Sequence, residues 1–309
     1  MKRVLVSAPV LLLLLLPQVP PAFRAGISVV RVDADVHDGR RGVEDLTQQD
    51  FRVTDNGKPQ TILYFGHTDE PLDVILLFDT SGSMMPAVRQ VSDVARLALG
   101  TLRDGDRVAV MAFDADTTLV ADFTSDLAAV DDAIRARVLT RPPVPNTQIQ
   151  YSAADAARHF RAQPATSRRR VVLIVTDNMG LKKDKGAVAE FWESDAVLTG
   201  VVVPGLAAMR HQRMMSPIGW FGIGGIDDIV SRTGGDILKV KEEVGDGFRE
   251  SIQRLRQRYT LHYEMPAARP GEQRHVRIEL IGDAARRHRG ARISARTGYI
   301  VPGAGPRRN

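Results

Sequence analysis

The chain has 309 residues, of which 43% are hydrophobic and 26% charged, the composition of an ordinary globular protein; this excludes collagen, a coiled coil and a wholly disordered chain. It contains no cysteine, which excludes disulfides, thiol nucleophiles and thiolate metal sites. Its 42 basic and 37 acidic residues leave a net charge of +5, too small to indicate nucleic-acid binding. We expect one large folded unit or two modest ones.

The first 25 residues have the order of a secretory signal peptide. Lys2 and Arg3 precede an apolar run at residues 4–16, which is shorter than the roughly 20 residues of a membrane-spanning helix. We therefore expect cleavage near Ala25 and export to the periplasm, the cell envelope or the medium. An uncleaved anchor is the alternative. No later segment has the length and hydropathy of a span, so membrane contact is expected only through export.

Residues 26–70 have the period of half-buried strands. Apolar and polar residues alternate from Val30 to Val36, and a second alternation over residues 51–65 is interrupted by Asn56-Gly57, a pair typical of a tight hairpin turn. This part is expected to form a small β unit.

Residues 71–258 have a different hydropathy pattern, which predicts buried strands that alternate with helices. Nearly continuous apolar runs occur at residues 72–78, 107–113, 171–175 and 196–203. Strands that are apolar on both faces are buried on both faces, and helical periods separate these runs. The fold class predicted is α/β, a doubly wound and mainly parallel sheet that ends in a helix near residues 243–258.

The two-residue period returns in residues 259–301, which we expect to be β strands. Because β segments flank the α/β domain on both sides, we predict that they pair into one small sheet in which the domain is inserted. Residues 302–309 are of low complexity and are expected to be disordered.

Oxygen-bearing side chains follow the predicted strand ends. Asp79, Ser81 and Ser83 form a D-x-S-x-S pattern directly after the first buried strand, in the crevice where open α/β sheets bind ligands. Thr147 precedes a predicted helix and Asp177 follows the third buried strand, so both should reach the same crevice. Carboxylates and hydroxyls on tight loops are hard donors, which suit a cation such as Mg²⁺.

This pattern resembles the von Willebrand factor type A domain and its metal-ion-dependent adhesion site. The resemblance covers about residues 72–258 and implies a bound Mg²⁺ or Mn²⁺ whose octahedron is completed by a carboxylate of a protein partner. The ligands it implies are Ser81, Ser83 and Thr147, with Asp79 and Asp177 acting directly or through water.

The resemblance extends to the flanks and has two departures. Segments at residues 50–60 and 296–299 are similar to those of an exported bacterial subgroup typified by acidobacterial sequences. Pro145-Asn146 precedes the threonine where the family often has two glycines, and Asn178 stands where a glycine usually follows the aspartate. The first departure is expected to stiffen the threonine loop and the second to crowd the open face of the metal.

A site of this composition favours binding over catalysis. Hydroxyl-rich ligation with two carboxylates leaves a cation electron-poor, so it attracts an external Asp or Glu. The three loops contain no His or Glu that could act as a base, so we expect a non-enzymatic adhesion or assembly module with a protein partner. Two alternatives stay open: a structural cell-envelope module whose Ser and Asp merely cap a helix, and a metal-assisted hydrolase.

Two further features of the sequence are a long connection and three basic clusters. The connection at residues 204–225 is rich in Met and Gly and either forms an apolar rim for a partner or packs on the domain's own surface. The basic clusters at residues 168–170, 254–258 and 286–289 are expected to be solvated faces or turns.

Overall fold

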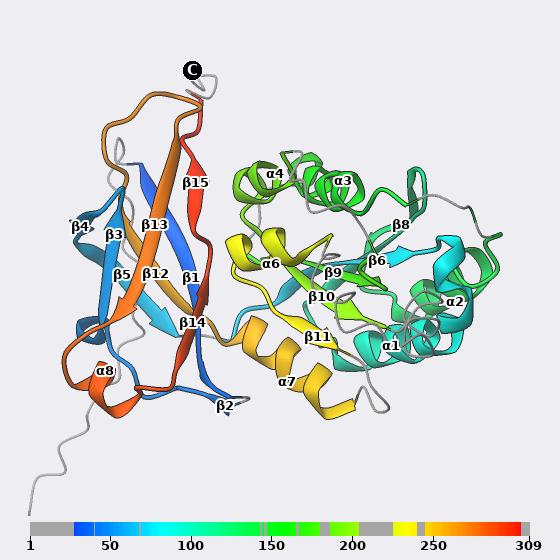
Figure 1. Cartoon of the computed structure of the whole chain (residues 1–309), viewed down its shortest axis with the longest axis horizontal. Coiled ribbons are helices and arrows are strands. Elements are labelled where there is room, and N and C mark those ends of the chain that lie inside the picture. Colours follow the sequence, from blue (N-terminus) through cyan, green and yellow to red (C-terminus); the bar gives the residue numbers. More distant parts are fainter. Residues whose placement is uncertain are drawn as a thin grey trace, which may run out of the picture.

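The computed structural model consists of a β unit beside an α/β domain (Figure 1). It describes residues 28–303, apart from residues 40, 68, 143, 145–146, 165–166, 180–185, 204–224 and 240–244. The expected signal peptide, most of the tail and nearly all of the 204–225 connection lie outside the described residues. In the part that is described, no helix is long and apolar enough to cross a membrane.

The α/β domain is built on a six-stranded sheet with the order β11-β10-β9-β6-β7-β8. The strands are β6 (Leu72–Asp79), β7 (Arg107–Phe113), β8 (Thr117–Thr124), β9 (Arg169–Thr176), β10 (Ala196–Val202) and β11 (Ile237–Lys239). All neighbours pair in parallel except β7 and β8, which form an antiparallel hairpin. The predicted fold class, a mainly parallel doubly wound sheet, is confirmed.

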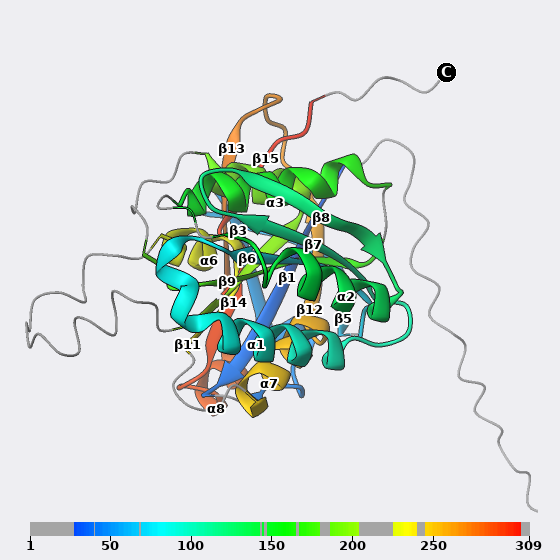
Figure 2. The same cartoon turned by 90° about the vertical axis from the view of Figure 1, so that its right-hand side faces the viewer.

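Helices cover both faces of this sheet (Figure 2). They are α1 (Val88–Thr101), α2 (Leu127–Arg137), α3 (Ile149–Ala162), α4 (Ala187–Ser194), α6 (Asp227–Thr233) and α7 (Gly245–Arg256), and a 3-10 turn, η2 (Gly82–Ala87), leads into α1. Residues of α1, α2 and α7 share one apolar cluster with one face of the sheet, and residues of α3, α4 and α6 share a second cluster with the other face.

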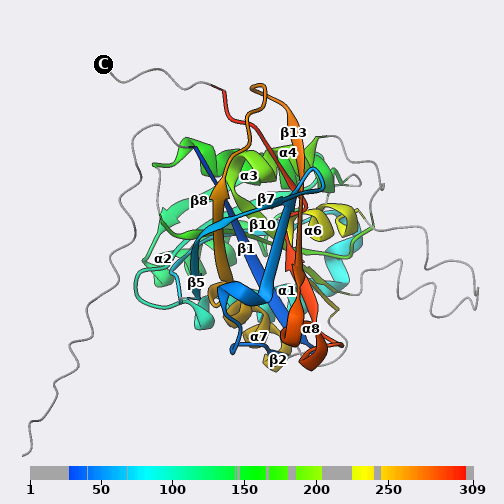
Figure 3. The same ribbon diagram turned by 90° about the vertical axis from the view of Figure 1, so that its left-hand side faces the viewer.

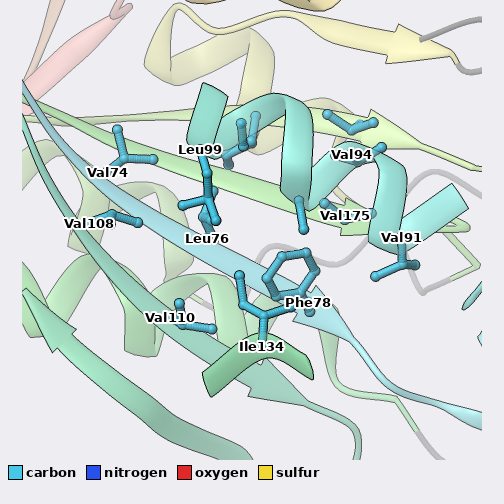
Figure 4. Packing of buried hydrophobic residues seen from close by; sticks show 14 of the residues in the cluster. Val74, Leu76, Phe78, Val91, Val94, Leu99, Val108, Val110, Ile134 and Val175 are labelled. Carbon is cyan, nitrogen blue, oxygen red and sulfur yellow. The ribbon is translucent and has the colours of Figure 1, made fainter. Parts of the chain in front are cut away.

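Strand β6 shows why its sequence is apolar throughout. Leu76 and Phe78 lie in the first cluster, where they face Val91 and Val94 of α1 (Figure 4), whereas Leu77 lies in the second cluster. All eight residues of the strand are buried. A strand in this position needs apolar side chains on both faces, because helices exclude water from both.

The β unit consists of two sheets that pack face to face around one apolar cluster (Figure 3). One sheet has the order β14-β1-β12-β5, with β2 paired to β1, and the other has the order β15-β13-β3-β4. The strands are β1 (Val29–Asp38), β2 (Arg41–Gly42), β3 (Phe51–Asp55), β4 (Lys58–Gln60), β5 (Ile62–His67), β12 (Tyr259–Glu264), β13 (Gln273–Leu280), β14 (Arg292–Ala295) and β15 (Gly298–Ile300). The short helices are η1 (Gln48–Asp50) and α8 (Gly282–Arg287).

The flanking segments pair with each other, as predicted, but they do not form one sheet. β1 and β5 both pair with β12 in the first sheet, while β3 pairs with β13 in the second. The predicted hairpin over residues 51–65 is also split. Its turn at Asn56 and Gly57 has the expected positive φ angles, 47° and 77°, but after β4 the chain crosses to the other sheet. A single sheet would leave one apolar face open to water, and two sheets cover each other.

The prediction that the basic clusters are solvated is wrong for two of the three. Arg169, Arg256 and Arg258 are only 5%, 2% and 3% exposed and lie at the junction between the two units. Arg169 donates to Glu70 at 3.1 Å and to Thr260 Oγ1 at 3.1 Å. It therefore connects β9 with the segment that leaves the β unit after β5 and with β12, where the chain returns to that unit. These guanidinium groups can be buried because carboxylates and carbonyl oxygens accept their hydrogen bonds.

The strongest of these pairs joins α7 to the loop before β7. Arg256 donates to both carboxylate oxygens of Asp106, at 2.9 and 2.5 Å, and the backbone N–H groups of Leu72 and Arg103 also donate to that carboxylate. Burial alone would raise the pKa of Asp106, but these hydrogen bonds hold its pKa below the ordinary value. A lowered carboxyl pKa means that the stabilisation is complete above about pH 5 and is lost as the pH falls.

We predict that Asp106→Asn lowers the free energy of unfolding at pH 7 by about 3–5 kcal/mol, because it leaves the buried Arg256 without its charge partner. Urea unfolding at pH 7, 5 and 3.5 measures this, and the variant should lose less stability than the wild type between pH 5 and 3.5. Asp93→Asn is the control, since Asp93 pairs with Arg96 at an exposed site and should change stability by less than about 1 kcal/mol. Equal losses in the two variants would contradict the prediction.

Candidate metal centre

The predicted site lies where β6 and β9 end side by side. These strands pair in parallel up to the register of Phe78 with Val175, so their carboxyl ends meet at one edge of the sheet. Asp79 is the last residue of β6 and Asp177 comes directly after β9. Both are buried, at 2% and 8% exposure. The parallel register therefore brings two carboxylates to one buried site.

The first loop holds its polar atoms in a local hydrogen-bond network. Asp79 Oδ1 accepts the backbone N–H of Ser81 at 3.0 Å, and Asp79 Oδ2 accepts the hydroxyl of Thr176 at 2.7 Å. The hydroxyl oxygens of Ser81 and Ser83 lie 3.2 Å apart. The loop thus presents two hydroxyls together beside a carboxylate whose orientation is set by residues of both strands.

The second loop is attached to the first on one side of Thr147. Ser81 forms an isolated parallel bridge with Val144, and the N–H of Gly82 donates to the Val144 carbonyl at 3.0 Å. On the other side, the N–H of Gln148 donates to the carbonyl of Asp114, which follows β7, at 3.0 Å. The segment that carries Thr147 is therefore anchored to the first loop on one side and to the residue after β7 on the other. Pro145-Asn146 lies outside the described residues.

The third loop leaves one carboxylate oxygen of Asp177 unused. Its Oδ1 accepts the N–H of Met179 at 3.1 Å, whereas its Oδ2 is buried and has no hydrogen-bond partner among the described residues. Buried polar atoms nearly always have a hydrogen-bond partner or a ligand. A buried carboxylate oxygen without a partner among the described residues is therefore a candidate ligand for a bound group.

Asn178, which was expected to crowd the site, has a different role. It adopts a positive φ of 58°, the conformation that a glycine would take most easily. Its side-chain Oδ1 accepts the N–H of Ile226 at 3.0 Å and its Nδ2 donates to Asp227 at 2.8 Å. Asn178 thus ties the third loop to the start of α6. The side chain's two bonds to α6 were not expected from the sequence, although Asn is the residue after glycine that best tolerates this backbone.

The electrostatics of the two aspartates favour a cation. Burial raises the pKa of Asp79 to about 6; hydrogen bonds from Ser81 and Thr176 oppose the shift, and the negative charge of Asp177 adds to it. A nearby positive charge stabilises a carboxylate and would reverse both unfavourable effects.

The donor set fits a hard divalent cation. Two carboxylates and three hydroxyls, those of Ser81, Ser83 and Thr147, are oxygen donors of the kind that Mg²⁺ and Mn²⁺ prefer. Within the described ranges, no group of three or more His, Cys, Asp or Glu side chains is placed to hold a metal. A site of two carboxylates depends on its hydroxyls for the remaining protein ligands.

An apolar pocket opens beside the first loop, and the sequence did not reveal it. Asp79 and Ser81 line it together with Met84, Leu139 and Arg141. Met85 also lines the pocket and is 57% exposed. The pocket forms because the end of α2 comes close to η2, a contact between segments about fifty positions apart. The two methionines directly after the D-x-S-x-S pattern are the feature of the sequence that could have indicated an apolar pocket here.

Comparison with known families gives one match, which covers the whole candidate site. Residues 74–180 match the von Willebrand factor type A domain. This range includes the first, second and third loops. No curated protein matches the chain.

Solved structures with some likeness to this chain include three of different origin. BatB from Bacteroides thetaiotaomicron, described as a conserved hypothetical protein, is 18% identical with a TM-score of 0.46, over 60% of this chain and 96% of that one. Manganese-loaded TRAP of Plasmodium vivax is 13% identical with a TM-score of 0.45, over 78% and 100%. A von Willebrand factor type A protein from Catenulispora acidiphila is 12% identical with a TM-score of 0.40, over 91% and 76%.

Proposed function

We propose that this von Willebrand factor type A region is a metal-dependent protein-binding module of an exported protein. The residues that would hold Mg²⁺ or Mn²⁺ are Asp79, Ser81, Ser83, Thr147 and Asp177. The observation that carries the proposal is the buried Oδ2 of Asp177, which has no partner in the part of the chain that the structure describes and lies at the strand end next to the buried Asp79. When bound, the cation supplies a positive charge that can receive an Asp or Glu carboxylate of a partner.

The chain's own residues prepare this site before any partner arrives. Thr176 and the backbone of Ser81 hold both oxygens of Asp79, so the carboxylate cannot rotate away. Asn178 holds the third loop against α6. Preorganised ligands lose little conformational entropy on binding, which favours affinity.

Binding without hydrolysis is supported by the composition of the loops. Hydrolysis needs a positioned base, and residues 79–84, 142–147 and 177–179 contain no His or Glu. Asp79 is engaged through both oxygens and Asp177 belongs to the donor set. We therefore propose a non-enzymatic role in adhesion or assembly, outside the cytoplasm if residues 1–25 direct export.

We predict that Asp177→Asn weakens Mn²⁺ binding at least 10-fold, because it removes the negative charge and one oxygen of a carboxylate whose Oδ2 has no partner among the described residues. Ser81→Ala should also weaken it, through loss of a hydroxyl ligand. Isothermal titration with Mn²⁺ and Mg²⁺ measures both. Asp116→Asn, which alters an aspartate of the nearby β7–β8 hairpin outside the donor set, is the control and should bind as the wild type does. An unmetallated structural module would give no heat in any of these proteins.

We predict that the wild-type protein retains partners from a cell-envelope extract only while a divalent cation is present, and releases them on chelation or on addition of an excess of glutarate. Asp177→Asn should retain none of them, since it lacks the charge that holds the cation. Affinity capture with and without chelator, followed by identification of the eluted proteins, tests this. Turnover of an ester or peptide panel that disappears in Asp79→Ala would contradict the non-enzymatic role and support a hydrolase.

A further inference from the structure

A second pocket, lined by charged residues, lies at the junction of the two units, at the opposite end of the sheet from the candidate metal centre. It is lined from the amino ends of β9 and β10 and from the β unit. Its charged lining residues are Asp33, Arg169, Arg170, Asp195, Arg258 and Arg296. The pocket has a volume of about 20 Å³, which is room for a monatomic ion or one to two water molecules.

Arg258 is the residue that this pocket leaves unsatisfied. It is 3% exposed, and its Nη2 donates to the carbonyl of Gly234 at 2.5 Å. Its Nε and Nη1 are buried and have no hydrogen-bond partner among the described residues. The Nε of Arg296, in the same lining, is also buried and unpartnered. Two guanidinium groups of one pocket lining therefore have buried N–H donors without a partner among the described residues.

The carboxylates around the pocket are already paired with other arginines. Asp33 accepts two hydrogen bonds from Arg31, at 3.1 and 3.0 Å, and lies 4.0 Å from Arg169. Asp195 pairs with Arg296 at 3.0 Å. In the part of the chain that the structure describes, no carboxylate pairs with Arg258. The lining holds four arginines and two aspartates, and Glu70, outside the lining, pairs with Arg169.

The buried Arg258 does not become neutral by losing its proton. Burial lowers the pKa of Arg258; the charges of Asp35, Asp33 and Asp236 oppose this shift, whereas that of Arg169 adds to it. The group nevertheless stays charged at any pH at which the protein is folded. A buried charge without a carboxylate at ion-pair distance is costly, so a mobile anion would stabilise the folded protein.

We propose that this pocket binds a chloride ion, held by the Nε and Nη1 groups of Arg258 and the Nε of Arg296. Water would satisfy the donors but would bring no negative charge to them. Arg258 lies between α7 of the α/β domain and β12, whereas Arg296 lies between β14 and β15 of the β unit. A chloride held by both therefore connects the end of the α/β domain to the β unit.

Thermal unfolding in the presence of EDTA tests the proposal independently of the metal centre. Replacing 150 mM sodium gluconate with 150 mM sodium chloride should raise the unfolding midpoint of the wild type by about 2 °C or more, with saturation as chloride increases. Arg258→Met should abolish the difference between the two salts. Arg286→Met is the control, because Arg286 lies on the exposed surface of the β unit, and it should keep the full difference.

Crystals grown in sodium bromide give a direct readout that does not depend on whether Arg258→Met folds. Anomalous scattering at the bromine edge should show a peak within hydrogen-bond distance of Arg258 Nη1 in the wild type. Ordered water at that position without an anomalous peak would overturn the proposal. So would a chloride effect of equal size in Arg258→Met and the wild type. A peak without any saturable effect on the midpoint would reveal an adventitious ion only, and would also overturn it.

Discussion

The parallel pairing of β6 with β9 in the middle of the six-stranded sheet is the constraint on which the rest of the structure depends. It requires both strands to be apolar on both faces, and helices must then cover each face. The same pairing brings the ends of the two strands to one edge, where Asp79 and Asp177 become buried neighbours. Hydrogen bonds orient one of these acids, and the proposed cation would compensate the charge of both.

The junction between the units follows a different rule from the two apolar interiors. Here the buried side chains are arginines, and they are matched by carboxylates and carbonyl groups that come from distant parts of the chain. Each pair has a fixed geometry, so the interface is specific in orientation as well as in composition. Arg258 donates to the carbonyl of Gly234 but pairs with no carboxylate among the described residues, and the proposed chloride would supply the negative charge there.

Much of the architecture could be predicted from hydrophobic periods alone. Strand β7 has the bounds that its apolar run predicts, and the D-x-S-x-S pattern stands at a strand end as expected. The division of the β unit into two sheets could not be predicted, because alternation shows which face of a strand is buried and not which strand lies beside it. The burial of Arg256 also escaped prediction, since its partner Asp106 is 150 positions away in the chain. Likewise, the role of Asn178 depends on α6, which follows a long connection.

The insertion of the α/β domain into the β unit has a consequence for folding. Thr260 of β12 bonds to Asp33 of β1 across 227 positions of sequence, and similar distances separate the other strand partners from the two flanks. Closure of such long loops is slow, because their entropy is lost before the pairs form. During synthesis, strands β1 to β5 therefore have unpaired edges until β12 to β15, which begin at Tyr259, have been made. In that interval the edges are exposed to aggregation, and a chaperone that binds them would protect the chain.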